Sequence, residues 1–261
     1  MTETPLRPAA TVMLLRDAEG GVEVFMVRRT AAAAFAGGLY VFPGGRVDDA
    51  DGAPEIAAMV SGLDDVGAST RLGVPSGGLA YWVAAIRECF EEAGLLFAHA
   101  AGGGRRVPAV DEERWAVHNG DLSMLELCRR HDVLLDAGAL RYVSHWVTPV
   151  GESRRRFDTR FFLAAAPDGQ DGRHDDAELD DSRWVAPGDA LDAADQGALV
   201  LMQPTAANLQ LIAASATVAD ALAVADAAGP PPRIEPRIRR DADGHMVGIA
   251  LPADPDYDDL A

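Results

Sequence analysis

The stretch RECFEEAGLL, residues 87–96, places an arginine and three glutamates inside what otherwise reads as an apolar helix. The pattern of LAYWVAAIRECFEEA predicts a helix over residues 79–93, which Gly94 would end because glycine readily adopts the left-handed C-cap conformation. Residues three and four apart share a helix face. The glutamates therefore project together from one face, and they are Glu88, Glu91 and Glu92.

Three neighbouring carboxylates repel one another and raise each other's pKa unless a cation lies among them. A divalent ion with oxygen ligands meets that need, and magnesium prefers a few carboxylates together with water and phosphate oxygens. The alternative is a solvated acidic face in which Arg87 pairs with Glu91 at i+4. The spacing alone leaves both interpretations open.

The segment upstream of this helix has a different character. The sequence LYVFPGGRVDDADG is a strand that runs into Pro43, Gly44 and Gly45. Glycine has no side chain, so this backbone can approach a ligand or a helix closely.

Together the two segments resemble the signature of the Nudix hydrolase family, G-x5-E-x7-R-E-U-x-E-E-x-G-U, where U is a bulky apolar residue. In the first half, Gly45 is followed by Asp51, an acidic substitute for the usual glutamate. The second half matches closely, and its positions are Arg87, Glu88, Cys89, Glu91, Glu92, Gly94 and Leu95.

The departure from the signature is an interruption. Residues 52–86 separate Asp51 from Arg87, where the signature allows seven residues, so about 28 are extra. An alignment that starts at Gly73 would put Leu79 at the glutamate position. We prefer the interrupted signature, because a longer loop costs little additional closure entropy.

Interruption at this point resembles the branch of the family that includes the mammalian peroxisomal coenzyme A diphosphatase. Three further segments are similar to that branch: WVTP at 146–149, RFDTRFF at 156–162 and QPT at 203–205. The resemblance covers roughly residues 9–227.

The resemblance implies an α+β fold, an α/β/α sandwich with a mixed sheet between helices. We expect a Nudix domain over residues 1–228, with inserts near 52–79 and 99–140, and a proline-rich C-terminal arm over 229–261. The residue pattern itself predicts a hairpin from strands 10–16 and 22–29. Further strands are expected at RYVSHWVTP, RRFDTRFFLAAA and SRWVAP, followed by one long helix that begins near Thr205.

The resemblance also implies hydrolysis of a nucleoside diphosphate linked to another moiety, with Mg²⁺ or Mn²⁺ as the cofactor. Glu88 or a carboxylate from a later loop would be the general base, and Arg87 would orient a helix glutamate. The implied metal ligands are Glu88, Glu91, Glu92 and, from a later acidic loop, Glu178. The implied substrate-binding residues are Gly44, Gly45, Arg29 and Arg156.

Three of these assignments have alternatives of at least equal weight. Arg29, at the end of the second strand, either binds phosphate or faces water. The arginines at 154–156 either bind phosphate through charge-assisted hydrogen bonds or form a basic strand entry that faces water. Glu178 and its neighbours either supply a ligand or form a solvated acidic loop.

The composition limits the kinds of molecule that this protein can bind. Forty-one acidic and 23 basic residues give a net charge of −18, which opposes binding to a nucleic-acid backbone. The two cysteines, Cys89 and Cys128, cannot form a disulfide framework, and no apolar run approaches membrane-spanning length. We therefore expect a cytoplasmic protein that binds neither nucleic acid nor membrane. The resemblance to the Nudix family adds two expectations, a small nucleotide-type substrate and a homodimer as a candidate assembly.

Three functional classes remain at this stage. The leading hypothesis is a metal-dependent diphosphatase, with coenzyme A or an acyl-coenzyme A as the first substrate and ADP-ribose, NADH and oxidised nucleotides open. The second is a non-hydrolytic nucleotide-binding or regulatory module, suggested by Asp51 and by the long insert. The third is an interaction protein whose acidic helix face is only solvated.

Overall fold

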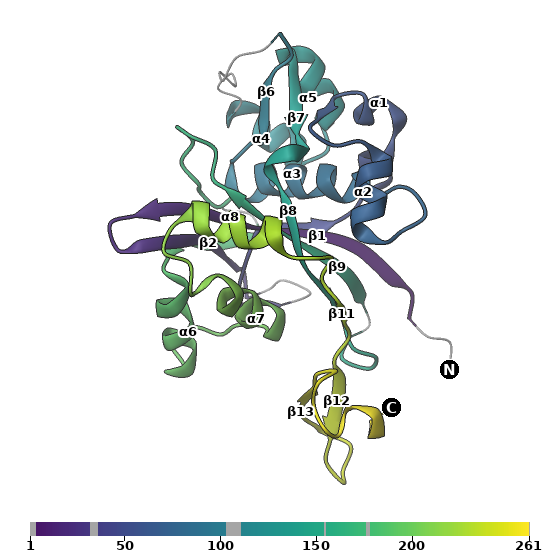
Figure 1. The fold of residues 1–261 in the computed structure, drawn as a ribbon, viewed down its shortest axis with the longest axis vertical. Helices are drawn as coiled ribbons and strands as arrows, with labels where there is room; N and C mark the ends of the chain where they lie inside the picture. Colours follow the sequence, from purple (N-terminus) through teal and green to yellow (C-terminus); the bar gives the residue numbers. More distant parts are fainter. Residues whose placement is uncertain (1–3, 32–35, 103–110, 154, 176–177, 261) are drawn as a thin grey trace.

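The computed structural model describes residues 4–31, 36–102, 111–153, 155–175 and 178–260 (Figure 1). Its centre is a mixed sheet in which six strands follow one another in the order β10-β2-β1-β9-β8-β11. These strands are β10 (Leu179–Val185), β2 (Gly21–Arg29), β1 (Leu6–Ala18), β9 (Arg156–Ala165), β8 (Arg141–Val147) and β11 (Arg233–Ile234). The pairs β1–β9 and β8–β11 are parallel, and the other pairs in this order are antiparallel.

Two short strands extend the sheet beside the glycine segment. Strand β3 (Tyr40–Val41) pairs with β2, and β4 (Gly44–Arg46) pairs with β1. Thr11 of β1 lies opposite Gly44, and Ala10 lies opposite Gly45. The predicted strand before the two glycines is thus an integral part of the sheet.

Helices cover both faces of this sheet, as the alternation of side chains along β1 requires. Val12 and Leu14 belong to the core that α3 (Leu79–Ala93) covers, whereas Met13 and Leu15 belong to the core on the other face. Three helices pack on that second face: α6 (Pro187–Asp195), α7 (Gln203–Ile212) and α8 (Val218–Ala227). The predicted sandwich is confirmed (Figure 1).

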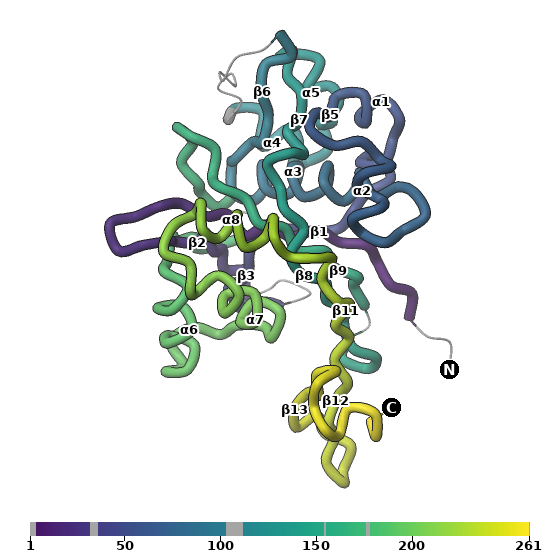
Figure 2. Tube along the Cα trace, viewed as in Figure 1, coloured from purple at the N-terminus to yellow at the C-terminus, as the bar shows by residue number. Residues whose placement is uncertain are grey.

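The two inserts fold together, which the sequence did not indicate. A separate three-stranded sheet has the order β5-β7-β6, with β5 from the first insert and its partner β7 from the second (Figure 2). The first insert supplies α1 (Pro54–Ala57), β5 (Val60–Ser61) and α2 (Asp65–Leu72). The chain from β6 onward supplies β6 (Ala98–Ala100), α4 (Asp111–His118), α5 (Met124–His131) and β7 (Val133–Asp136).

Asp65, at the start of α2, ties this insert to the start of α3. One carboxylate oxygen accepts a hydrogen bond from the Leu79 N–H at 3.0 Å, and the other accepts one from the Gly77 N–H at 3.0 Å. These backbone hydrogen bonds lower the pKa of Asp65. The insert therefore returns the chain to a defined position for α3.

Other local predictions have mixed outcomes. The β1–β2 hairpin and the helix over 79–93 are confirmed. The single long helix from Thr205 is wrong, because α7 ends at Ile212 and Thr217 caps a new helix, α8. Helix α6 was not predicted, since its alanine- and aspartate-rich sequence has only a weak apolar face.

The C-terminal arm is structured. Strand β11 joins the main sheet, and β12 (Arg237–Arg240) and β13 (Met246–Ala250) form a hairpin beyond it, followed by a short 3-10 turn at Tyr257–Asp259 (Figure 2). Within the described residues, no helix is both long and apolar enough to span a bilayer.

Candidate active site

Helix α3 is anchored by its apolar side. Trp82, Ile86 and Phe90 are fully buried, and the Trp82 ring packs edge-on against Phe162 of the sheet with centroids 4.8 Å apart. Gly94 ends the helix with a φ of 72°, in the left-handed region that glycine favours. This packing directs Glu88 and Glu92 toward strand β4, whereas Glu91 lines a separate small pocket with Arg114 and His174.

The glycine strand lies directly against these acids. The Gly44 N–H donates to Glu92 Oε2 at 2.8 Å. A Cβ atom at position 45 would lie 2.5 Å from Glu88 Oε1, and one at position 44 would lie 2.5 Å from the Ala10 carbonyl oxygen. Position 44 therefore requires glycine, because a side chain there would displace the backbone of β1, whereas a side chain at position 45 would displace the Glu88 carboxylate.

Arg87 organises the site from its other side. Its Nε and Nη2 donate to the two carboxylate oxygens of Asp51 at 3.0 and 2.9 Å, and Nη2 also donates to the Arg46 carbonyl at 2.8 Å. Nη1 donates to Glu88 Oε1 at 2.8 Å and to Glu91 Oε1 at 3.3 Å. Arg87 thus holds two of the glutamates, which agrees with the orienting role expected of it.

Asp51 is buried, with only 3% of its side chain exposed, and it also accepts the Asp48 N–H at 2.8 Å. Burial acts to lower the pKa of Arg87, but its hydrogen bonds to Asp51 and the charges of Glu88, Asp51 and Glu91 outweigh it and raise the pKa. Asp51, which takes the place of the usual glutamate, thus contacts Arg87 with both of its carboxylate oxygens.

The pKa values of all three glutamates on α3 are raised. Burial raises the pKa of Glu88 to about 7, although Arg87 partly offsets this. Burial, again opposed by Arg87, raises the pKa of Glu91. Burial and the charge of Glu88 raise the pKa of Glu92 well above its usual value. Buried like charges of this kind are stabilised by an additional cation.

The donor set fits Mg²⁺ or Mn²⁺, which take carboxylate oxygens together with water. The oxygens of Glu88, Glu91 and Glu92 nevertheless do not form one compact cluster. Among the described residues, only Asp241, Asp243 and His245, on the exposed β12–β13 turn, bring three such ligand atoms within 4.8 Å of one another. Guanidinium groups lie beside the glutamates instead, so an ion at α3 would need bridging water or a shift of Arg87.

Arg29 and Glu178 lie at the same site. Arg29, at the end of β2, has Nη1 at 3.7 Å from Glu92 Oε1 and Nη2 at 3.4 Å from Glu178 Oε2. Glu178 is 55% exposed, and its role as a metal ligand stays a prediction. Nearby Asp175 is buried, and its carboxylate accepts the N–H groups of Glu178 and Leu179.

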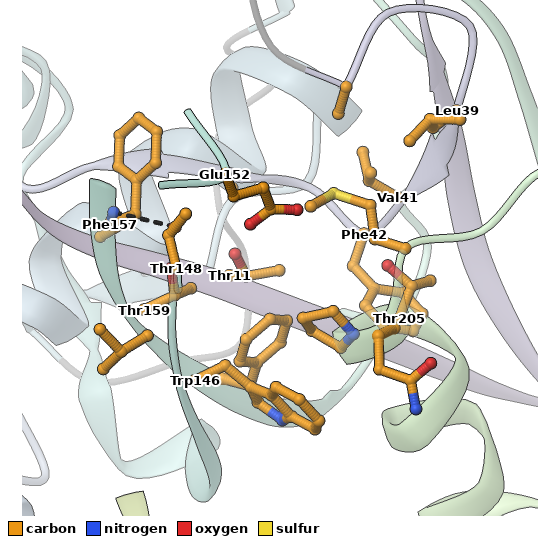
Figure 3. A pocket seen from close by; sticks show the side chains of 18 of the residues that line it. Thr11, Leu39, Val41, Phe42, Trp146, Thr148, Glu152, Phe157, Thr159 and Thr205 are labelled. Atoms are coloured by element: carbon orange, nitrogen blue, oxygen red, sulfur yellow. Dashed lines mark hydrogen bonds between the residues drawn. The ribbon is translucent and has the colours of Figure 1, made fainter. Parts of the chain in front are cut away.

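A cavity of about 560 Å³ opens beside this acidic face and is lined by Arg29, Gly44 and Gly45. The glutamates of α3 do not themselves line this cavity. Arg29, Gly44 and Gly45 connect the cavity to them. Figure 3 shows Leu39, Val41 and Phe42 on one side, Thr148, Phe157 and Thr159 on the other, Trp146 below and Glu152 projecting inward. The volume suits a small-molecule ligand.

Arg156 requires a correction. Its side chain is 1% exposed, and its guanidinium donates to the Thr148 carbonyl and to Glu235 of the arm. It is therefore a buried structural arginine, and the prediction that it binds substrate is not supported. Arg155, next to it, lines the cavity instead, whereas residue 154 lies outside the described residues.

Sequence reasoning missed several site residues. Arg114, from the second insert, is 8% exposed and donates to the Glu91 carbonyl at 2.8 Å, which supports the last turn of α3. Glu152, Pro236 and Ile249 line the cavity. No local signal marks these residues, because each reaches the site through a long-range contact.

Comparison with known proteins agrees with this geometry. A family described as the NUDT19 Nudix domain matches residues 65–212, more than half of the chain. The solved structure of a Nudix hydrolase from Alicyclobacillus acidocaldarius is 30% identical, covers 88% of this chain and all of its own, and superposes with a TM-score of 0.72. This chain belongs to the Nudix hydrolase family.

Curated relatives of this Nudix chain carry the name acyl-coenzyme A diphosphatase. The chicken protein (Gallus gallus) is 27% identical over an alignment of 235 positions, and the match covers 71% of this chain and 62% of that protein. The human protein (Homo sapiens) is 27% identical over an alignment of 208 positions, and the match covers 66% of this chain and 56% of that protein. The chain thus spans less than two thirds of these relatives.

Proposed function

We propose that this Nudix protein hydrolyses the diphosphate linkage of a nucleoside diphosphate-linked compound, with coenzyme A or an acyl-coenzyme A as the leading substrate. The observation that carries the proposal is the placement of Glu88 and Glu92 against the glycine strand, beside a ligand-sized cavity that the two glycines line, with Glu91 held next to Glu88 by Arg87. The curated relatives are named for acyl-coenzyme A, which supports this substrate class.

Glu88, Glu91 and Glu92 would hold Mg²⁺ or Mn²⁺, with Glu178 as a further candidate. When bound, such an ion polarises phosphate oxygens and stabilises the leaving group. The protein's own groups supply the rest of the chemistry. Arg29 faces the cavity, where its guanidinium can bind phosphate oxygens through charge-assisted hydrogen bonds.

The reaction adds water across one phosphorus–oxygen bond. The water oxygen attacks phosphorus, the bond to the bridging oxygen breaks, and a carboxylate takes the proton that water loses. Glu88 and a carboxylate from a later loop, Glu152 or Glu178, are the candidates for that base. The products are a nucleoside monophosphate and the phosphate ester of the other moiety.

The non-hydrolytic alternative is not favoured. That alternative was motivated by Asp51 and by the interruption of the signature. Neither feature disturbs the geometry of the site. Asp51 pairs with Arg87 through both oxygens, and the insert folds into its own layer while Asp65 holds the start of α3.

A hydrolysis panel tests the proposal. Coenzyme A, acyl-coenzyme A, ADP-ribose, NADH, dinucleoside polyphosphates and nucleoside triphosphates are each incubated with Mg²⁺ or Mn²⁺. We expect hydrolysis of the coenzyme A compounds, loss of activity in Glu91→Gln and Glu92→Gln, and normal activity in the control Glu19→Gln, on the exposed β1–β2 turn.

Two outcomes would oppose the proposal. Absence of hydrolysis with every substrate and both metals would end it. Tight nucleotide binding without turnover, unchanged by Glu91→Gln, would establish the binding-module alternative.

A further inference from the structure

The C-terminal arm, residues 229–261, lies beyond the family match at 65–212, yet it forms part of the cavity wall. Pro236, just before β12, and Ile249, on β13, both line the cavity. A segment that composition predicted only as a proline-rich arm is therefore part of the cavity wall.

The sheet register places this wall far from the acids. Gly45, Ala10, Arg160, His145 and Arg233 are successive cross-strand partners along one row from β4 to β11. Four strand spacings separate the ends of the row, which is roughly 19 Å at about 4.8 Å per spacing. The cavity thus has room for a substituent much longer than the diphosphate itself.

The arm is fastened to both neighbouring elements. Glu235 pairs with the buried Arg156 of β9 and with Arg233 at 2.7 Å, and its carbonyl accepts the Tyr257 hydroxyl at 2.7 Å. Arg240 donates to the Gly151 carbonyl of the β8–β9 loop at 3.2 Å. These contacts explain why Arg156 is buried and hold the wall in a fixed position.

The arm's own part of the cavity wall is apolar, whereas Glu152 and Arg155 of the β8–β9 loop line the same cavity with charged groups. The side chains of Pro236 and Ile249 offer no hydrogen-bonding group, and the same cavity is lined by the rings of Trp146 and Phe157. A wall of this kind favours an apolar group over a base or sugar, whose polar edges would lose their water without compensation.

We propose that the arm receives the apolar, non-nucleotide substituent of the substrate, and that Ile249 sets the substituent length that is accepted. This inference rests on the proposed function, because it places the diphosphate at Gly44 and Gly45. Ile249 is a specificity-determining residue, remote from the bond that breaks.

The test compares Ile249→Ala and Ile249→Trp with the wild type on coenzyme A and its acetyl, hexanoyl and decanoyl esters. Ile249→Trp is expected to lower kcat/KM for the decanoyl ester, relative to coenzyme A, by about tenfold, the usual effect of a changed apolar contact. Ile249→Ala is expected to shift the preference toward the longer ester. Val247→Ala, on the same strand but 63% exposed, is the matched control and leaves the preference unchanged.

The inference would be overturned if the Ile249 variants changed kcat/KM equally for all four substrates, or changed it for none of them. If the wild type hydrolyses nothing, the proposed function fails, and calorimetric binding of decanoyl-coenzyme A tests the arm separately. About tenfold weaker binding by Ile249→Trp would then support the inference, whereas unchanged affinity or no wild-type binding would refute it. Circular dichroism shows whether Ile249→Trp is folded. If it is not, the result with Ile249→Ala decides the question.

Discussion

The contact between Gly45 and Glu88 gives the sharpest prediction. A Cβ atom at position 45 would lie 2.5 Å from the Glu88 carboxylate, whereas ordinary contacts begin at 3.4 Å. In Gly45→Ala, the carboxylate must therefore withdraw by about 0.9 Å. Because the obstacle is the end of a flexible side chain, the fold can absorb this shift, and the free energy of unfolding should fall by only about 1 kcal/mol.

The effect on the reaction should be larger. A misplacement of about 1 Å in a catalytic site costs roughly 100-fold in rate. We expect kcat/KM for the best substrate of the panel to fall by about that factor, and Mn²⁺, titrated calorimetrically, to bind more weakly. Urea unfolding, measured on the same sample, separates loss of stability from loss of activity.

The matched control is Gly188→Ala in the first turn of α6, where an added Cβ meets nothing within 4 Å. It should keep full activity. Glu88→Gln provides the reference for complete loss of this carboxylate. The reasoning is refuted if Gly45→Ala retains wild-type kcat/KM while Glu88→Gln does not, because the position of Glu88 would then not matter.

Three further predictions follow from the charged contacts. Arg87→Gln leaves the carboxylate of Asp51 buried without its partner, so urea unfolding should show a loss of about 3–5 kcal/mol; a loss below about 1 kcal/mol would contradict the pairing. Chelation with EDTA should abolish hydrolysis, and excess Mg²⁺ or Mn²⁺ should restore it; activity that persists in EDTA would exclude a metal role for α3. Burial acts to raise the pKa of Asp158, but His145 and Arg160 outweigh it and lower the pKa below the ordinary 3.8. Its ionised form therefore adds stability above that value, which is lost as the pH falls through the folded-state pKa, and Asp158→Asn should flatten this acid limb in thermal unfolding.

The features that sequence predicted well are local. The bounds of α3, its C-cap at Gly94 and the shared face of the three glutamates depend on contacts within a turn or two, where side-chain periodicity is decisive. The β1–β2 hairpin is equally local. The family signature added the link between this helix and the glycine strand.

The features that sequence could not predict depend on distant partners. Arg155 and Arg156 are adjacent and chemically identical, yet one lines the cavity and the other is buried against Glu235, 79 residues away. Composition predicted only a proline-rich arm, but pairing of β11 with β8 brings Pro236 and Ile249 to the cavity.

The sequence by itself determined which helix carries the acids and which strand carries the glycines, because steric and periodic rules act on neighbours in the chain. Only the tertiary structure decided how far apart the acids lie, which arginines reach the ligand and what closes the far end of the cavity. Those outcomes depend on the pairing of strands and inserts distant in sequence, and the periodicity of one segment does not record the position of another.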